Sequence, residues 1–158
     1  MDETGFWIGI LGGEEVIVPS GVTELYTASP ENQTTITIIK AVSAVGKSTP
    51  PVLIIPRKVH MNSWYHESLH GTELILLSES GYLNDQLAMK WLKHFITHTK
   101  STSESEYKLL LLNSHLSHLS LAFTIRADEC NILTYAFPSH LTHILQPLDV
   151  GIFQPYKH

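Results

Sequence analysis

The chain has 158 residues, 43% of them hydrophobic, which suits one globular domain with a single buried core. Its formal net charge of −5 and its pI near 6.0 argue against a free-standing nucleic-acid binder, because such domains usually have a basic face and a pI above about 9. The lone Cys130 excludes an internal disulfide framework, and no apolar run approaches the roughly 20 residues that span a bilayer. These features predict an intracellular protein without a membrane segment.

The first part of the chain is predicted to be mostly extended. Residues 6–18 alternate apolar stretches with glycines, which is typical of two extended pieces joined by a turn. β-Branched residues dominate 33–42, and a short apolar run occupies 52–55 before Pro56. Both runs are predicted to be strands.

The region after residue 83 carries the strongest helical pattern in the sequence. Leu87, Trp91 and Phe95 recur at every fourth position, which gives one apolar stripe at helical spacing. Asn84 or Asp85 precedes the stripe, and both residue types cap helices through a side-chain oxygen. The sequence therefore predicts an amphipathic helix that begins at this point.

A strand, a helix and another strand are predicted next. The apolar run 107–112 is broken only by Lys108, as in a strand buried on both faces, which predicts a central position in a parallel sheet. A helix over 120–130, capped by Ser120, and a strand over 132–137 follow.

The last predicted element is a helix near the end of the chain. Pro147 suits its first turn, where the missing N–H costs nothing, and the helix would carry Asp149 and Phe153. The order strand, strand, helix, strand, helix, strand, helix predicts an α/β fold, a mixed sheet covered by helices.

Three short segments of the sequence stand out: Asp2-Glu3-Thr4-Gly5-Phe6, Leu110-Leu111-Leu112-Asn113-Ser114-His115-Leu116-Ser117-His118 and His140-Leu141-Thr142-His143-Ile144-Leu145-Gln146-Pro147-Leu148-Asp149. They resemble the active-site segments of DDE superfamily endonucleases, the transposase catalytic domains of the pogo, jerky and centromere-protein-B kind. The order of the segments and the 36 positions from residue 113 to residue 149 also match the family pattern.

The resemblance implies an RNase H-like fold, with a mixed sheet flanked by helices and two divalent metals held between three acidic residues. By this comparison Asp2 is the first acid and Asp149 the third, and Asn113 stands where the second acid should be. The implied catalytic positions are Asp2, Asn113 and Asp149. The implied metal ligands are Asp2 and Asp149, which would hold Mg²⁺ or Mn²⁺.

Asn113 predicts a weakened site. An amide oxygen can ligate a cation but brings no negative charge, so we expect weak metal binding and little or no DNA cleavage. The alternative is a non-enzymatic domain that retained the transposase fold for binding DNA or a protein partner. Read singly, each of Asp2, Asn113 and Asp149 is more often a turn or cap residue; the order of the motifs favours common descent.

The start of the sequence predicts a partial domain. Met1 directly precedes Asp2, so the first core strand, which in this family runs into the aspartate from upstream, is expected to be truncated. The family's N-terminal helix-turn-helix region is also absent from the sequence. We therefore expect residues 1–158 to form a partial catalytic domain, from a gene-model fragment or a decayed copy of a mobile element.

Four histidines form two pairs with the same spacing. The resemblance implies that they support the metal ligands as hydrogen-bond donors, and a zinc-stabilised interaction module is the competing interpretation, since zinc sites use such pairs. The four residues are His115, His118, His140 and His143.

The resemblance also implies DNA as the partner and the nucleus as the location. No membrane partner is expected, and self-association is left open.

Overall fold

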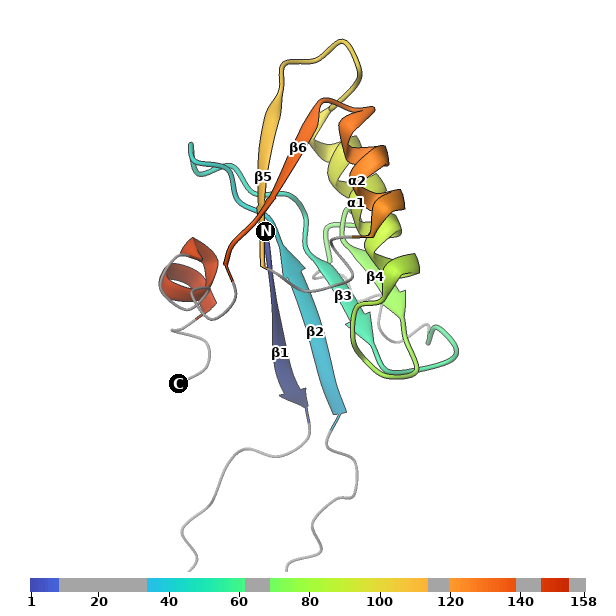
Figure 1. The fold of residues 1–158 in the computed structure, drawn as a ribbon. Coiled ribbons are helices and arrows are strands. Elements are labelled where there is room, and N and C mark those ends of the chain that lie inside the picture. Colours follow the sequence, from blue (N-terminus) through green and yellow to red (C-terminus); the bar gives the residue numbers. More distant parts are fainter. Residues whose placement is uncertain (9–33, 62–68, 114–119, 139–145, 154–158) are drawn as a thin grey trace, which may run out of the picture.

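The computed structural model describes residues 1–8, 34–61, 69–113, 120–138 and 146–153 (Figure 1). Four strands form one sheet in the order β1-β2-β3-β4, and β5 and β6 form a second sheet. The strands are β1 (Asp2–Ile8), β2 (Thr34–Lys40), β3 (Val52–Ile55), β4 (Leu74–Leu77), β5 (Lys108–Leu112) and β6 (Ile132–Ala136). The helices are α1 (Asp85–Thr99), α2 (Leu121–Asp128) and the π-helical turn η3 (Asp149–Phe153). The predicted mixed α/β class is confirmed.

β1 begins at the first candidate acid. It has seven residues and pairs antiparallel with β2 over its whole length, from Asp2 opposite Lys40 to Ile8 opposite Thr34. Pairing with the β-branched run in β2 holds the residues after Asp2 extended. The expected truncation concerns the part of this strand upstream of Asp2, and it stays a prediction.

β3 and β4 complete the four-stranded sheet. β3 pairs antiparallel with β2, and β4 pairs parallel with β3. β4 was not predicted from the sequence, because four apolar residues alone fit a strand and a buried helical turn equally well. The predicted turn within residues 6–18 lies mostly outside the described residues.

α1 begins and packs as its periodicity predicts. Asn84 caps it, its side-chain Oδ1 accepting a hydrogen bond from the backbone N–H of Leu87 at 3.0 Å. The ring of Trp91 stacks on Phe95 and on Phe123 of α2, with centroid distances of 5.3 Å and 6.4 Å. Large rings bury the most apolar area, so this cluster is the main stabilising contact of the described core.

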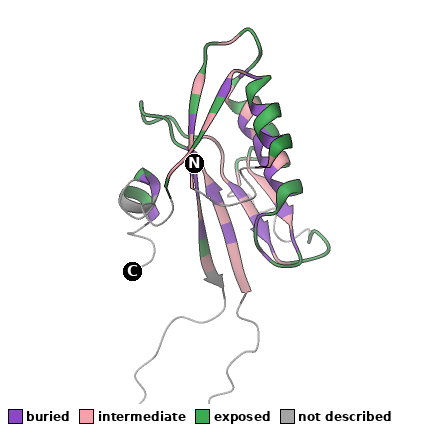
Figure 2. Ribbon diagram, in the orientation of Figure 1, coloured by how far each residue is buried: buried purple, intermediate pink, exposed green. Residues whose placement is uncertain are grey.

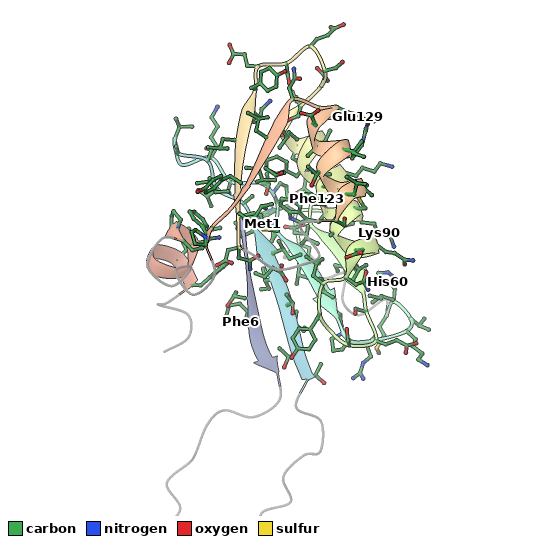
Figure 3. All side chains as sticks on the ribbon, in the orientation of Figure 1. Met1, Phe6, His60, Lys90, Phe123 and Glu129 are labelled. Atoms are coloured by element: carbon green, nitrogen blue, oxygen red, sulfur yellow. The ribbon has the colours of Figure 1, made fainter. Side chains whose placement is uncertain are left out.

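Both helices present their buried residues to the sheets and their exposed residues to solvent (Figure 2). α2 follows its Ser120 cap, as predicted, and its residues Phe123 and Ala127 are fully buried. Figure 3 shows Phe123 on the inner side of α2. Cys130, at the end of the same segment, is a buried free thiol.

β5 differs from its prediction in two ways. Leu110 and Leu112 are buried, whereas Leu109 is 65% exposed, so the strand is covered on one face only. It pairs in parallel with β6, as predicted, but among the described strands it has no ladder partner on its other edge, so it is not central. Burial of the second face depends on a covering element, which the composition of the strand does not reveal.

Candidate functional site

The amino end of β1 lies against β5 (Figure 3). The backbone ammonium of Met1 donates a hydrogen bond to the carbonyl of Leu111 at 2.6 Å, which joins the two sheets. Burial lowers the pKa of this ammonium to about 6, and the charge of Asp2 acts in the opposite direction. Asp2, the next residue, is only 3% exposed, so the first candidate acid is buried where the sheets meet.

Asn113 is the first residue after β5, as predicted, and lies two positions beyond Leu111. Its side-chain Oδ1 is buried and accepts no hydrogen bond within the described part of the chain. Leaving such an oxygen unsatisfied costs about 1–3 kcal/mol, so native structures usually supply a partner. The position expected for the second acid therefore presents a buried oxygen with unused capacity to accept.

Gln146 is a buried residue for which the sequence predicted no role. It is 1% exposed, and its Nε2 donates a hydrogen bond to the backbone carbonyl of Met1. Its Oε1 is buried and accepts no hydrogen bond from any described residue. The sequence offered one indication that Gln146 matters: it lies in the third motif, three residues before Asp149.

The structure places the third candidate acid in part. Asp149 is the first residue of η3, whose backbone is described but whose first side chain is not. Gln146 brings the start of this segment within hydrogen-bonding distance of Met1. Two hydrogen bonds therefore connect Met1, the neighbour of Asp2, to Gln146 and to Leu111, which lies two positions before Asn113. The remaining predicted residues lie outside the described ranges: His115, His118, His140 and His143.

The oxygen atoms of this region suit a hard cation. Thr4 lies two residues after Asp2, on the same face of β1. It also buries a hydroxyl Oγ1 that makes no hydrogen bond within the described chain. Carboxylate, amide and hydroxyl oxygens are ligands that Mg²⁺ and Mn²⁺ accept, whereas zinc prefers nitrogen and sulfur. Among the described residues no three His, Cys, Asp or Glu side chains form a group that could hold a metal ion of any kind.

Comparison with known proteins identifies the family. The sequence profile of the DDE superfamily endonucleases matches residues 32–158, which is most of the chain. The chain belongs to the DDE superfamily endonucleases. The matched region contains Asn113 and Asp149 and begins after Asp2.

A curated relative aligns over almost the whole chain. It is a protein of Cochliobolus lunatus named "MFS-type transporter clz9", 32% identical over 163 residues. The alignment covers 99% of this chain and 17% of the relative, so the chain spans about one sixth of that protein's length. No solved structure matches the chain. Within the described ranges, no helix has the length and apolar character needed to cross a membrane.

Proposed function

We propose that this chain is a transposase-derived nuclease core, RNase H-like, whose single domain covers residues 1–158 and whose cleavage of DNA is impaired. Membership of the DDE endonuclease family supports the nuclease ancestry. The observation that carries the proposal is the Oδ1 of Asn113, a buried oxygen without a hydrogen bond in the described chain, directly after β5. A neutral amide there suits a site that still ligates a cation but holds it weakly.

Three residues would hold the metal. Asp2 and Asp149 would each supply a carboxylate, and Asn113 would supply an amide oxygen. A pair of Mg²⁺ or Mn²⁺ ions in such a site activates the attacking oxygen and stabilises the leaving oxygen of a phosphodiester. Gln146 would act indirectly, because its hydrogen bond to the Met1 carbonyl positions the residue next to Asp2.

The loss of one carboxylate weakens the site electrostatically. Two divalent cations a few ångströms apart repel each other, and nearby anions offset that repulsion. With Asn113 in the second position, Asp2 and Asp149 are the two remaining anions of the three. We therefore expect at least one metal position to be weakly occupied, and cleavage to be slight or absent.

The same residue supports a second function, binding of DNA or a protein partner without cutting. A shift assay on labelled duplex DNA, with and without magnesium, separates the two functions. A retarded complex without any nicked product supports binding alone, and a magnesium-dependent nick supports a residual enzyme.

The decisive variant is Asn113→Asp, which restores the third carboxylate. We expect its magnesium- or manganese-dependent nicking of plasmid DNA to exceed that of the unchanged chain by about tenfold or more, as for other electrostatic contributions to a transition state. The matched control is Asn84→Asp, which adds the same charge at the cap of α1, where aspartate serves as well as asparagine.

Two outcomes would contradict the proposal. Strong and equal cleavage by the unchanged chain and by Asn113→Asp would show that the amide does not impair catalysis. Titration calorimetry that finds no gain in Mg²⁺ affinity for Asn113→Asp would show that residue 113 is not at a metal site.

DNA as the partner, the nucleus as the location and self-association as an open property complete the proposal. The transposase ancestry suggests the DNA partner and the nuclear location, and self-association stays open. The chain spans 17% of the length of its curated relative. The name of that relative describes the whole protein, so this alignment transfers no transport activity to the chain.

A further inference from the structure

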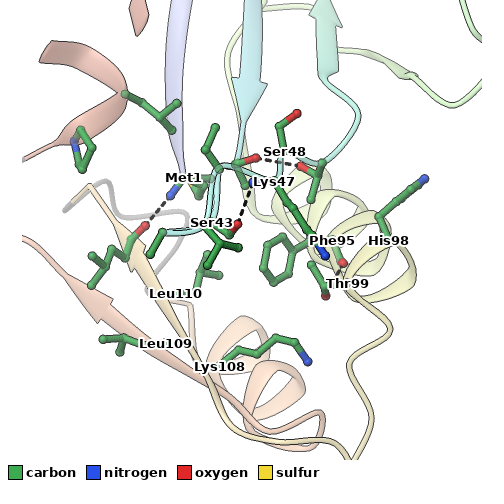
Figure 4. Close-up of a pocket in the computed structure, with 18 of the residues that line it drawn as sticks. Met1, Ser43, Lys47, Ser48, Phe95, His98, Thr99, Lys108, Leu109 and Leu110 are labelled. Atoms are coloured by element: carbon green, nitrogen blue, oxygen red, sulfur yellow. Dashed lines mark hydrogen bonds between the residues drawn. The ribbon is translucent and has the colours of Figure 1, made fainter. Parts of the chain in front are cut away.

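Two histidines of α1 form a close pair in the last turns of the helix. His94 and His98 are four positions apart, and residues at this spacing are neighbours on one face of a helix. Their ring centroids are 4.1 Å apart, and the rings are tilted by 46°. Figure 4 shows His98 directed outward from α1, on the side away from the buried ring of Phe95. The pair therefore lies at the outer side of the helical layer.

A backbone carbonyl determines which nitrogen of each ring carries the hydrogen atom. The Nδ1 of His98 lies 2.9 Å from the carbonyl oxygen of His94, and the Nε2 of His94 lies 3.1 Å from that of Pro50. A carbonyl oxygen only accepts, so each of these nitrogens donates, and the other nitrogen of a neutral ring keeps its lone pair. The nitrogens with a lone pair are Nδ1 of His94 and Nε2 of His98, and neither makes a hydrogen bond with a described residue.

This pattern of hydrogen bonds is typical of histidines that ligate metals. A metal-binding imidazole usually donates its other ring N–H to a carboxylate or a backbone carbonyl, which fixes the tautomer and makes the ligating nitrogen more basic. Both rings do so here, one to its own helix and one to the segment before β3. Burial lowers the pKa of His94, the Pro50 carbonyl raises it, and the charge of His98 lowers it, with a net lowering. This ring is therefore neutral at pH 7, the form that binds a metal.

The pair is separate from the proposed nuclease site. Ile39 of β2 belongs to the same buried core cluster as Phe95 of α1. Side chains alternate along a strand, so the next residue, Lys40, and its cross-strand partner Asp2 face the other side of the sheet. The preferred ions also differ, because Mg²⁺ prefers oxygen ligands, whereas imidazole suits Cu²⁺, Ni²⁺ and Zn²⁺.

We propose that His94 and His98 together bind a transition-metal ion, Cu²⁺ more tightly than Ni²⁺ or Zn²⁺. The two imidazoles are the protein ligands, and water completes the coordination, since the described chain offers no group of three metal-ligating side chains. The preference for Cu²⁺ follows the general affinity order of divalent metals for nitrogen ligands. A structural metal site has four protein ligands, so this open site exchanges its ion with solvent.

The test is a titration of the full chain with Cu²⁺ in excess magnesium, followed by NMR. Magnesium occupies oxygen ligands and leaves imidazoles free, so the two kinds of site are observed separately. Bound Cu²⁺ is paramagnetic and broadens the signals of nearby nuclei. We expect the backbone amides of His94 and His98 to broaden first, and titration calorimetry in the same buffer measures the affinity.

Two substitutions locate the ligands. His94→Gln and His98→Gln each remove one imidazole, and glutamine retains an amide donor for the carbonyl that the ring contacts. Loss of a residue that only supports a metal ligand typically costs about tenfold or more, so loss of a ligand should weaken Cu²⁺ binding at α1 by at least about tenfold. His70→Gln is the matched control, because His70 is an exposed histidine outside the pair, and it should leave the broadening of α1 unchanged.

A measurement of stability gives an independent readout. The two rings are neighbours only when the helix is formed, so an ion that binds both stabilises the folded chain. Zn²⁺ should therefore raise the urea midpoint of the unchanged chain and of His70→Gln by more than it raises that of His98→Gln. Circular dichroism of each variant without metal confirms that it is folded.

Three outcomes would overturn the proposal. Broadening of other regions while the amides of α1 stay sharp would place Cu²⁺ on other nitrogen atoms of the chain. Equal Cu²⁺ affinity of the unchanged chain, His94→Gln and His98→Gln would show that the two hydrogen bonds only hold the end of the helix. A loss in one of the two variants alone would indicate a single histidine ligand and no paired site.

Discussion

Around Trp91 and Phe123 the chain packs aromatic rings against one another, whereas Thr4, Asn113 and Gln146 each bury an oxygen atom that makes no hydrogen bond in the described chain. Each apolar atom of the rings gains free energy when it leaves water. Each of the three buried oxygens loses free energy unless a partner completes it. The rings therefore stabilise the helical layer, whereas the three oxygens are atoms that the proposed metal site would use.

The largest expected effect is in the aromatic region. Phe123→Ala removes a fully buried ring that stacks on Trp91, and we expect the free energy of unfolding to fall by about 3–5 kcal/mol, measured by urea denaturation. Leu121→Ala, on the exposed face of the same helix, should change it by no more than about 0.5 kcal/mol. Equal losses in the two variants would show that α2 does not pack as described.

A second substitution adds charge beside Met1. Gln146→Glu removes the donor to Met1 and places a carboxylate where the structure buries an amide, so stability without metal should fall by about 2 kcal/mol. Millimolar magnesium should restore part of this loss if the buried oxygens face a cation site. Gln86→Glu, in the exposed first turn of α1, is the control and should be neutral or stabilising. A loss that magnesium leaves unchanged would contradict the proposed metal site.

A smaller effect of opposite sign is expected for Thr4→Val. The substitution removes a buried hydroxyl that makes no hydrogen bond in the described chain, so stability in the absence of divalent cations should rise by about 1 kcal/mol. Chemical denaturation of the two chains in a chelating buffer measures the difference. Destabilisation of the variant would show that the hydroxyl has a partner in solution.

The smallest effect concerns pH and lies in the helical layer. Burial lowers the pKa of His94, although its Nε2 lies 3.1 Å from the carbonyl of Pro50, a contact that favours the protonated ring. The unfolded chain therefore binds the proton more readily, so stability is complete above the ordinary pKa near 6.5 and is lost as the pH falls through that value. We expect His94→Gln to reduce this loss by a few tenths of a kcal/mol after allowance for solvent screening. Urea denaturation midpoints of both chains, measured at acidic and at neutral pH, test this. An equal fall of the midpoint between the two pH values in both chains would contradict the prediction.

Local sequence patterns predicted most of the helical layer. The stripe of Leu87, Trp91 and Phe95 and the caps Asn84 and Ser120 determine α1 and α2 through contacts within a few residues. The features that these local patterns could not predict depend on residues that are distant in the sequence. Leu109 and Leu110 are the same residue type, and only the tertiary covering of one face makes the first exposed and the second buried.

The candidate site shows the same division. The resemblance to the DDE family named Asn113, and its position after β5 is as predicted. The buried role of Gln146 arises from a hydrogen bond to Met1, which lies 145 positions away in the chain. The register that sets Asp2 opposite Lys40 depends on β2, and the residues around Asp2 do not encode it by themselves.

The bond between Met1 and Leu111 also has a consequence for the order of folding. It joins residues 110 positions apart, whereas β5, α2 and β6 form one short, continuous segment. Closing a long loop costs more entropy than closing a short one, so local units tend to form early and distant pairings late. We therefore expect the β5-α2-β6 unit to be structured before β1 docks on it, so that a partly folded chain, or a nascent chain still on the ribosome, does not yet bury Asp2 against β5.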